Sequence, residues 1–243
     1  MSTYEEKVQR ELERWERKAL QPLSITNKIA KNWQNKINDK IPEKVHRTVS
    51  ESIKNMVKAT LAGSDYFSDQ EIIKEASLEV RETLIEKRIV MYKRTAAVEG
   101  AGTGAGGLLL GLADFPLLLS IKMKFLFDTA KIYGYDVSDY RERLFLLTIF
   151  QLAFSKEDKK KAALEKIKSW EVEKVNLPSK EFYMESIDWK TFQLEYRDFI
   201  DLPKTLQLIP GFGAIVGAVA NYHYLDVLGD HAKNSFRHRK LIQ

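Results

Sequence analysis

The sequence predicts an all-α fold, and three features of its 243 residues carry that prediction. Between the turn signals, apolar residues recur at the three- and four-residue spacing of a helix nearly everywhere. Glycine and proline, which interrupt helices, number only 12 and 6, and most of the glycine lies in two places. No segment alternates apolar and polar residues over a useful strand length. We therefore expect a multi-helix single domain of eight to ten helices, built around two glycine-rich apolar helices and without a significant sheet.

Residues 1–62 are expected to form amphipathic N-terminal helices. Val8, Leu12 and Trp15 share one face of a charged first helix. Isoleucine and tryptophan residues four apart then continue to Pro42, which ends a second helix because proline cannot extend one. A third helix is predicted by the apolar stripe of Val45, Val49, Ile53, Met56, Val57 and Leu61.

Residues 63–243 are expected to form the main helical domain. The segment AGSDYFSDQ breaks the helical pattern, and Ser68 or Asp69 would provide the N-cap of a long helix over about 70–98. One face of that helix would be buried through Ile73, Ala76, Val80, Leu84 and Met91.

The next helix ends are marked by small polar residues and one glycine. Gly134 fits the left-handed position that follows a helix C-terminus. Ser138 or Asp139 fits the N-cap of the following, largely apolar helix. The segment SKEDKKKAALEKIKSWEVEK indicates a solvent-facing helix, and FYMESIDWKTFQLEYRDFI indicates an aromatic-rich amphipathic one.

Two glycine-rich apolar segments, residues 100–127 and 205–228, set the centre of the expected domain. Small residues four apart form a flat stripe on a helix and let another backbone approach closely, so we expect the two segments to pack on each other. Residues expected to serve helix packing or membrane contact are Gly102, Gly106, Gly107, Gly111, Pro116, Gly213 and Gly217.

The first segment allows either a buried core hairpin or insertion into a membrane. Residues 101–121 contain a single charge, Asp114, and match the roughly 20 apolar residues that cross a bilayer. A carboxylate at the centre of a span costs roughly 2.5–3.5 kcal/mol, which argues against a simple lipid-exposed span. A re-entrant hairpin turning at residues 113–116 stays open, because ADFP is a plausible helix break. The run GAGTGAGG lacks the lysine of a phosphate loop and follows no strand.

Polar residues in these segments give one candidate catalytic site. His223, Asp226 and Asp230 share a helical face at i, i+3 and i+7, and Asp114 could join them from the other segment. Carboxylates and imidazole suit zinc, manganese or iron, and such a site could activate water for hydrolysis. The simpler interpretation is that these side chains satisfy one another in the core. No recognised catalytic motif is present, so the residues favour a non-enzymatic protein, and we assign no metal or other cofactor.

The charge balance is mildly basic, with 39 Lys and Arg against 34 Asp and Glu. Basic residues beside the apolar segments fit contact with an anionic cytoplasmic leaflet, although a solvated helix end explains each cluster alone. No dense basic stripe predicts a nucleic-acid partner. The absence of cysteine excludes disulfides and fits a cytoplasmic location. The basic flank comprises Lys87, Arg88, Lys93, Arg94, Lys122, Lys124, Arg237, Arg239 and Lys240.

Several of these segments, taken together, resemble the EcsC family of bacterial proteins. The resemblance rests on GAGTGAGGLLLGLADFPLLLSIKMKFLFDTAKIYGYD, on ERLFLLTIFQLAF, and on IPGFGAIVGAVANYHYLDVLGDHAKNSFRHRKL, and covers roughly residues 60–240. The family is named for an operon that also encodes the ATPase and membrane subunits of an ABC transporter. The resemblance therefore implies a membrane exporter as a partner, and it implies no catalytic residues.

We accordingly expect a protein that is peripheral at the inner face of the cell membrane. It would act as an accessory or regulatory partner of a membrane transport complex, with the glycine-rich pair contacting lipid or partner. One alternative is a hydrolase, with or without a bound metal, with its site between the two glycine-rich helices. Another is a soluble carrier of a lipid-like ligand. The sequence predicts no oligomeric state.

Overall fold

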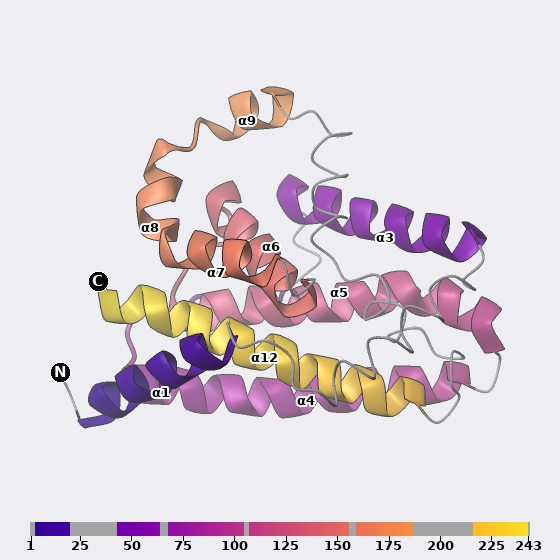
Figure 1. Cartoon of the computed structure of the whole chain (residues 1–243), viewed down its shortest axis with the longest axis horizontal. Helices are drawn as coiled ribbons and strands as arrows, with labels where there is room; N and C mark the ends of the chain where they lie inside the picture. Colours follow the sequence, from indigo (N-terminus) through magenta and orange to yellow (C-terminus); the bar gives the residue numbers. More distant parts are fainter. Residues whose placement is uncertain are drawn as a thin grey trace.

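The computed structural model describes residues 3–19, 43–63, 68–104, 107–155, 159–186 and 216–242. Over these stretches the chain forms nine α-helices and one short 3-10 helix, without a β-strand, which confirms the all-α fold. The centre consists of three helices of 27 residues each: α4 (Leu78–Gly104), α5 (Gly107–Tyr133) and α12 (Val216–Ile242). They run side by side along the long axis of the molecule, and α4 contacts both of the others (Figure 1).

Shorter helices cover this central layer. α1 (Thr3–Ala19) lies against α12, and α3 (Glu43–Ala62) lies against α5 and α6 (Tyr140–Phe154). α7 (Lys160–Lys168) packs on α6. The chain then leaves the body in an arm, which Figure 1 shows curving outward. The arm consists of α8 (Trp170–Glu173), the 3-10 helix η2 (Lys174–Asn176) and α9 (Lys180–Ser186).

The apolar stripes predicted for the first and third helices are confirmed over the described side chains. Val8, Leu12 and Trp15 are buried on α1. The expected second helix lies outside the described residues, and the division of the chain near residue 62 stays a prediction. On α3 the buried apolar residues are Val49, Ile53, Met56, Val57 and Leu61.

The long fourth helix begins eight residues later than predicted. α4 starts at Leu78, and Ser77 precedes it in the N-cap position, where its Oγ accepts from the Val80 N–H at 3.4 Å. Residues 68–77 instead form a non-helical strap along the C-terminal end of α5. The strap's Ile73 N–H donates to the Lys131 carbonyl at 2.9 Å, so contacts to another helix replace the bonds that helix formation would have supplied.

Arg81 holds the other side of the strap. Its guanidinium donates to the carbonyls of Ile73, Lys74 and Ala76 in the strap and of Ile132 in α5, at 2.6–3.1 Å. Arginine has five N–H donors, so a single side chain can satisfy four carbonyls that lack helical partners. Helix propensity in residues 70–77 is overridden by this tertiary contact.

The predicted buried face of α4 is also wrong. Val80 and Met91 are 50% and 41% exposed, whereas Arg81 and Glu82 are buried. The buried face of α4 combines Ile85, Tyr92 and Ala96 with these two charged residues, whose partners are carbonyls or another charge. The apolar face is therefore shifted around the helix from the predicted one. The helix predicted to face solvent over residues 155–174 faces it on one side only. Its region forms α7 and α8, which bury Ala163, Leu164, Ile167 and Trp170.

Both helix-end predictions between α5 and α6 are confirmed. Gly134 has φ +92°, its N–H donates to the Lys131 carbonyl, and the Tyr135 N–H donates to the Ala130 carbonyl. These two bonds form the Schellman motif that ends α5. Asp139 is the N-cap of α6, and its carboxylate accepts from the Arg141 N–H at 2.9 Å.

Replacing Gly134 with alanine is expected to lower the free energy of unfolding by about 2 kcal/mol or more. A left-handed backbone costs an L-residue roughly 1–2 kcal/mol, and a Cβ at this position would lie 2.9 Å from the Ile73 carbonyl oxygen of the strap. Urea unfolding followed by circular dichroism measures the change. Glu75→Ala, on the exposed part of the strap, is the control. Equal stability of the two variants would contradict the argument.

The alternative of a turn at residues 113–116 is wrong, because α5 is continuous through Asp114 and Pro116. α4 ends at Gly104, and α5 begins at Gly107. Five glycines within residues 100–107 make that stretch costly to keep helical, whereas Pro116 removes a single helical hydrogen bond. Within the described parts of the chain, none of the helices has the length and hydropathy to cross a membrane.

Candidate functional site

Three helix ends converge at the side of the molecule farthest from the two termini (Figure 1). They are residues 95–104 of α4, 107–121 of α5 and 216–225 of α12. Glu99 and Asp114 are the only charged residues in these three segments of sequence. We call them the apolar end. The two glycine-rich stretches therefore lie toward the same side of the molecule (Figure 1). Their packing on each other stays a prediction.

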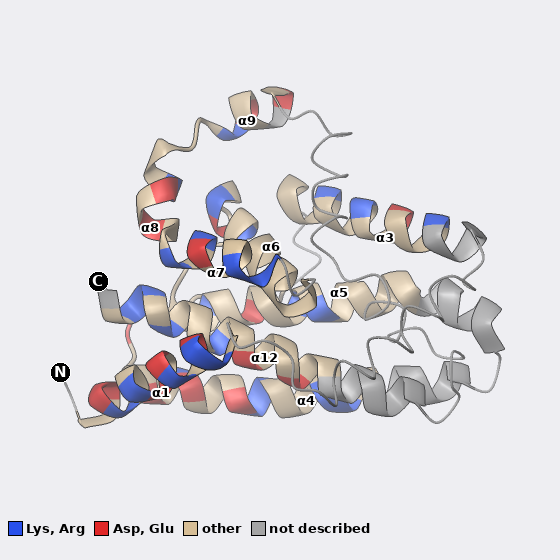
Figure 2. Ribbon diagram, in the orientation of Figure 1, with Lys and Arg blue, Asp and Glu red and all other residues tan. Residues whose placement is uncertain are grey.

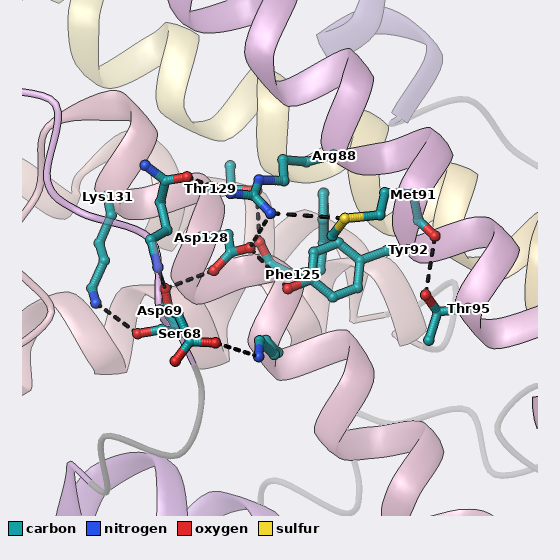
Figure 3. A network of polar contacts seen from close by, with 12 residues as sticks. Ser68, Asp69, Arg88, Met91, Tyr92, Thr95, Phe125, Asp128, Thr129 and Lys131 are labelled. Atoms are coloured by element: carbon teal, nitrogen blue, oxygen red, sulfur yellow. Dashed lines mark hydrogen bonds and ion pairs between the residues drawn. The ribbon is translucent and has the colours of Figure 1, made fainter.

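A set of polar contacts, some buried and some exposed, borders the apolar end on the side of the ion pairs. Lys93 of α4 and Asp226 of α12 form an ion pair at 2.5 Å. Asp128 of α5, only 2% exposed, accepts from the Tyr92 hydroxyl of α4 at 2.8 Å. Figure 3 shows Tyr92 and Arg88 reaching Asp128 from one side, and Ser68 from the other. We call Ser68, Arg88, Tyr92, Lys93, Asp128 and Asp226 the polar collar.

Asp128 is the centre of the collar. The Ser68 hydroxyl donates to its Oδ1 at 2.6 Å, and Arg88 lies 3.6 Å from its Oδ2. Burial, together with the negative charge of Asp128, raises the pKa of Tyr92, so its phenol stays a neutral donor. The network therefore joins the strap, α4 and α5 through one carboxylate. The sequence analysis missed Asp128, although a lone carboxylate in the apolar run FLFDTA is the signal that singled out Asp114.

The half of the central layer that lies away from the apolar end contains buried ion pairs. Arg237 of α12 forms a bidentate pair with Glu82 of α4 at 2.5 and 2.7 Å, and Glu11 of α1 lies 3.0 Å from it. Arg239 pairs in the same way with Glu142 of α6 at 2.6 and 2.8 Å. The charged residues of α1, α7 and α8 also lie toward this end (Figure 2). α4 and α12 thus have buried ion pairs in the half that lies away from the apolar end.

Two of the four candidate catalytic residues, Asp226 and Asp230, have described side chains. Asp226 is paired with Lys93, and Asp230 accepts from the Asn234 side chain at 3.1 Å. The side chains of Asp114 and His223 lie outside the described residues. Among the side chains that the structure does describe, no three of His, Asp and Glu are grouped so as to hold a metal ion.

The basic flank is divided by the fold. Lys122, Arg237 and Arg239 are buried, so for these three a role in surface contact is wrong. Their sequence position beside apolar residues reflects burial in the core rather than a helix end in water. Lys93, Lys124 and Arg88 bond to Asp226, Asp69 and Asp128. Lys240 is half-buried, and exposed basic side chains on α4 are Lys87 and Arg94.

One cavity of about 620 Å³ lies beside the collar, between the end of α3, the strap and the turn from α5 to α6. Ser68 and Lys131 line it on the collar side, and Phe127 is among its few apolar residues. Asp136 and Arg143 bring both signs of charge to the wall. A carrier of a lipid-like ligand needs a mainly apolar cavity, so this cavity gives that alternative no support.

Comparison with known proteins gives a single family. The model of the EcsC protein family matches residues 6–241. Protein EcsC of Bacillus subtilis (strain 168) is 48% identical over 227 residues, covering 93% of this chain and 92% of that protein. The uncharacterized protein YdbA of the same organism is 26% identical over 247 residues, covering 98% of this chain and 89% of that protein. No solved structure matches.

Proposed function

The chain belongs to the EcsC protein family, and from that premise we propose that it binds membranes peripherally through its apolar end. The observation that carries the proposal is the convergence of three helix ends whose 35 residues include only two charges. Helix ends of this apolar composition favour contact with a membrane or with another protein. In this role the protein is non-enzymatic and acts at the inner face of the cell membrane, as an accessory of a membrane transport complex.

Exposed basic residues beside the apolar end support an anionic bilayer as the occupant. α3, which lies along α5 near that end, has Arg47, Lys54 and Lys58 against Glu51 among its described side chains (Figure 1). Lys87 and Arg94 add two exposed cations on α4. Each cation near an anionic surface contributes about 1 kcal/mol. The paired members of the basic flank contribute less, so the association rests mainly on apolar contact and resists salt.

Leu117 tests the proposal, because its side chain is described and 45% exposed on α5. We expect Leu117→Asp to weaken binding to vesicles of phosphatidylglycerol and phosphatidylcholine by about tenfold or more. Burial of a leucine side chain contributes roughly 1.5–3 kcal/mol, and the new carboxylate adds repulsion. Flotation of the protein with the vesicles on a density gradient measures the partition.

The matched control is Val175→Asp, which introduces the same charge at a 74% exposed position on the arm. It is expected to bind like the unchanged protein. Binding equal in the two variants would place the contact away from the apolar end. An unchanged protein that fails to float with these vesicles would overturn the proposal itself.

A further inference from the structure

We infer that the outward side of α4 is a second membrane contact, and that this helix lies flat on an anionic bilayer at the level of the headgroups. This inference rests on the proposed membrane association of the apolar end. It adds a surface whose side chains are described, and it specifies how the long axis of the molecule is oriented on the membrane.

Apolar side chains form a stripe on the outward side of α4. Val80, Val90 and Met91 are 50%, 48% and 41% exposed, although they belong to a helix at the centre of the fold. Leu84, between them, is only partly buried. Val80 and Met91 are about three helical turns apart, so they lie on one line along the helix, about 16 Å from each other. We call Val80, Leu84, Lys87, Val90, Met91 and Arg94 the outer stripe.

The contacts of α4 show that the outer stripe points away from the other two central helices. Glu82 and Lys93 bond to α12, and Tyr92 bonds to α5. On a helix these three positions lie on the half opposite Val80 and Met91. In Figure 1, α4 lies along the lower edge of the molecule, with α12 and α5 above it. The stripe is therefore on the outside of the central layer.

The charges of the outer stripe are all positive. Lys87 and Arg94 are exposed, and Arg88, whose side chain is 33% exposed, lies at the edge of the stripe. Glu86 lies on the side of α4 that faces α12, 3.6 Å from a lysine of that helix. Glu79, two turns earlier, is on the same side as Glu86. The stripe thus combines apolar and cationic side chains without a carboxylate.

An anionic lipid surface fits this combination better than a protein does. Lys87 lies in the middle of the stripe, where a packed partner helix needs an apolar side chain. Two copies joined by a two-fold axis at the centre of the stripe would bring like cations together. At a bilayer the same lysine can bury its methylene groups against acyl chains and extend its ammonium to a phosphate. Helices that lie in the interface use this pattern, with the apolar face about 5–10 Å into the boundary between headgroups and acyl chains.

The length of the outer stripe predicts the orientation of the molecule. Val80 to Arg94 spans about 21 Å of helix, and the whole stripe contacts the interface only if α4 lies parallel to the bilayer. α4 runs along the long axis of the molecule and continues into the apolar end at residue 95 (Figure 1). The apolar end then meets the bilayer from its side and not tip first.

Replacement of the two exposed cations tests the electrostatic part of the contact. Lys87→Glu/Arg94→Glu is expected to weaken binding to phosphatidylglycerol–phosphatidylcholine vesicles at least about tenfold, because each cation near an anionic surface strengthens binding about fivefold. Lys161→Glu/Lys166→Glu makes the same change of net charge at exposed positions on α7 and is expected to weaken binding by less than about threefold. Flotation measures both. An equal loss in the two variants would overturn the outer stripe as the contact.

Fluorescent labels test the orientation. The chain has no cysteine, so single-cysteine variants of the full-length protein can each carry one NBD fluorophore. Val80→Cys and Met91→Cys report on the two ends of the outer stripe, Leu117→Cys on the apolar end, and Val175→Cys on the arm. The labelled proteins are bound to phosphatidylglycerol–phosphatidylcholine vesicles that contain lipids spin-labelled at carbon 5 or at carbon 12 of the acyl chain.

A flat helix holds its two ends at one shallow depth. We therefore expect labels 80 and 91 to be quenched to the same extent, within a factor of about 1.5, and more strongly by carbon 5 than by carbon 12. Label 175 is expected to be quenched by neither. Without lipid, the emission of labels 80 and 91 should not change as the protein concentration is raised.

Quenching of label 91 but not of label 80 would show that α4 stands upright on the membrane and would overturn the inference. Quenching of label 117 alone would also overturn it, and would leave the membrane contact of the apolar end in place. A change of labels 80 and 91 with protein concentration, in the absence of lipid, would make the outer stripe a contact between copies of the chain and contradict a lipid contact. Failure of the labelled and the unlabelled proteins to float with the vesicles would instead overturn the proposed function.

Discussion

Arg237→Ala is expected to lower the free energy of unfolding by about 3–5 kcal/mol, because it leaves Glu82 charged, buried and without its main partner. Arg237 and Glu82 join α12 to α4 through two hydrogen bonds of 2.5 and 2.7 Å, and their side chains are only 5% and 1% exposed. Burial alone would lower the pKa of Arg237, but the hydrogen bonds and charge of Glu82 outweigh it and raise the pKa. The guanidinium therefore stays charged in the interior.

The matched control joins the same two helices one turn away. Lys233 and Glu86 lie 3.6 Å apart, but Glu86 is 66% exposed. Solvent-exposed ion pairs contribute at most about 1 kcal/mol, so Lys233→Met should change stability little. Urea unfolding of both variants gives the comparison. A loss at Arg237 no larger than the loss at Lys233 would show that the buried pair does not hold α4 on α12.

Removing both charges shows how much of the stability lost in Arg237→Ala comes from the unpaired Glu82 rather than from loss of the ion pair itself. The double variant Glu82→Leu/Arg237→Met is expected to recover most of the stability lost in Arg237→Ala, since no isolated charge stays buried. Tyr4→Phe, which removes the 2.8 Å hydrogen bond from the tyrosine hydroxyl to Glu82, should cost only about 1 kcal/mol. If Arg237→Ala does not fold, this milder variant still measures how much the hydrogen bonds to Glu82 contribute to stability.

The sequence correctly predicted the features that depend only on residues close to one another in the chain. The stripe of Val8, Leu12 and Trp15, the positive φ of Gly134 and the N-cap at Asp139 each follow from spacing or from the chemistry of one residue. Such signals need no knowledge of what the helix packs against.

Several of the errors arise from contacts distant in sequence. Arg237 and Glu82 are 155 positions apart, so nothing near either residue shows that both are buried. The start of α4 differs from the prediction because the strap and Arg81 bond to the Lys131 and Ile132 carbonyls of α5. The sequence indicates one element over the first glycine-rich segment, residues 100–127, whereas the fold divides it between the end of α4 and the start of α5.

Lys122 differs from Arg237 because burial lowers its pKa instead of being outweighed by a carboxylate. We therefore expect Lys122→Met to raise the free energy of unfolding at neutral pH by about 3–4 kcal/mol. The side chain is fully buried on α5, where its Nζ donates to the Leu118 carbonyl at 3.4 Å. Burial lowers its pKa to about 7, whereas a lysine in an unfolded chain titrates near 10.5. Methionine fills a similar volume without an amine that must lose its proton on folding.

The pH dependence separates this explanation from simple repacking. Between about pH 7 and 10.5 the unfolded chain holds a proton on Lys122 that the folded protein does not, so the stability of the unchanged protein rises with pH across that window. The advantage of Lys122→Met should therefore be largest at or below pH 7 and should nearly vanish by pH 10.5. Lys124→Met, on the same helix at a 39% exposed position, is the control and should show no such trend. A variant that is less stable than the unchanged protein at every pH would mean that Lys122 is held as a charged, bonded ammonium, because only then does its removal cost stability throughout.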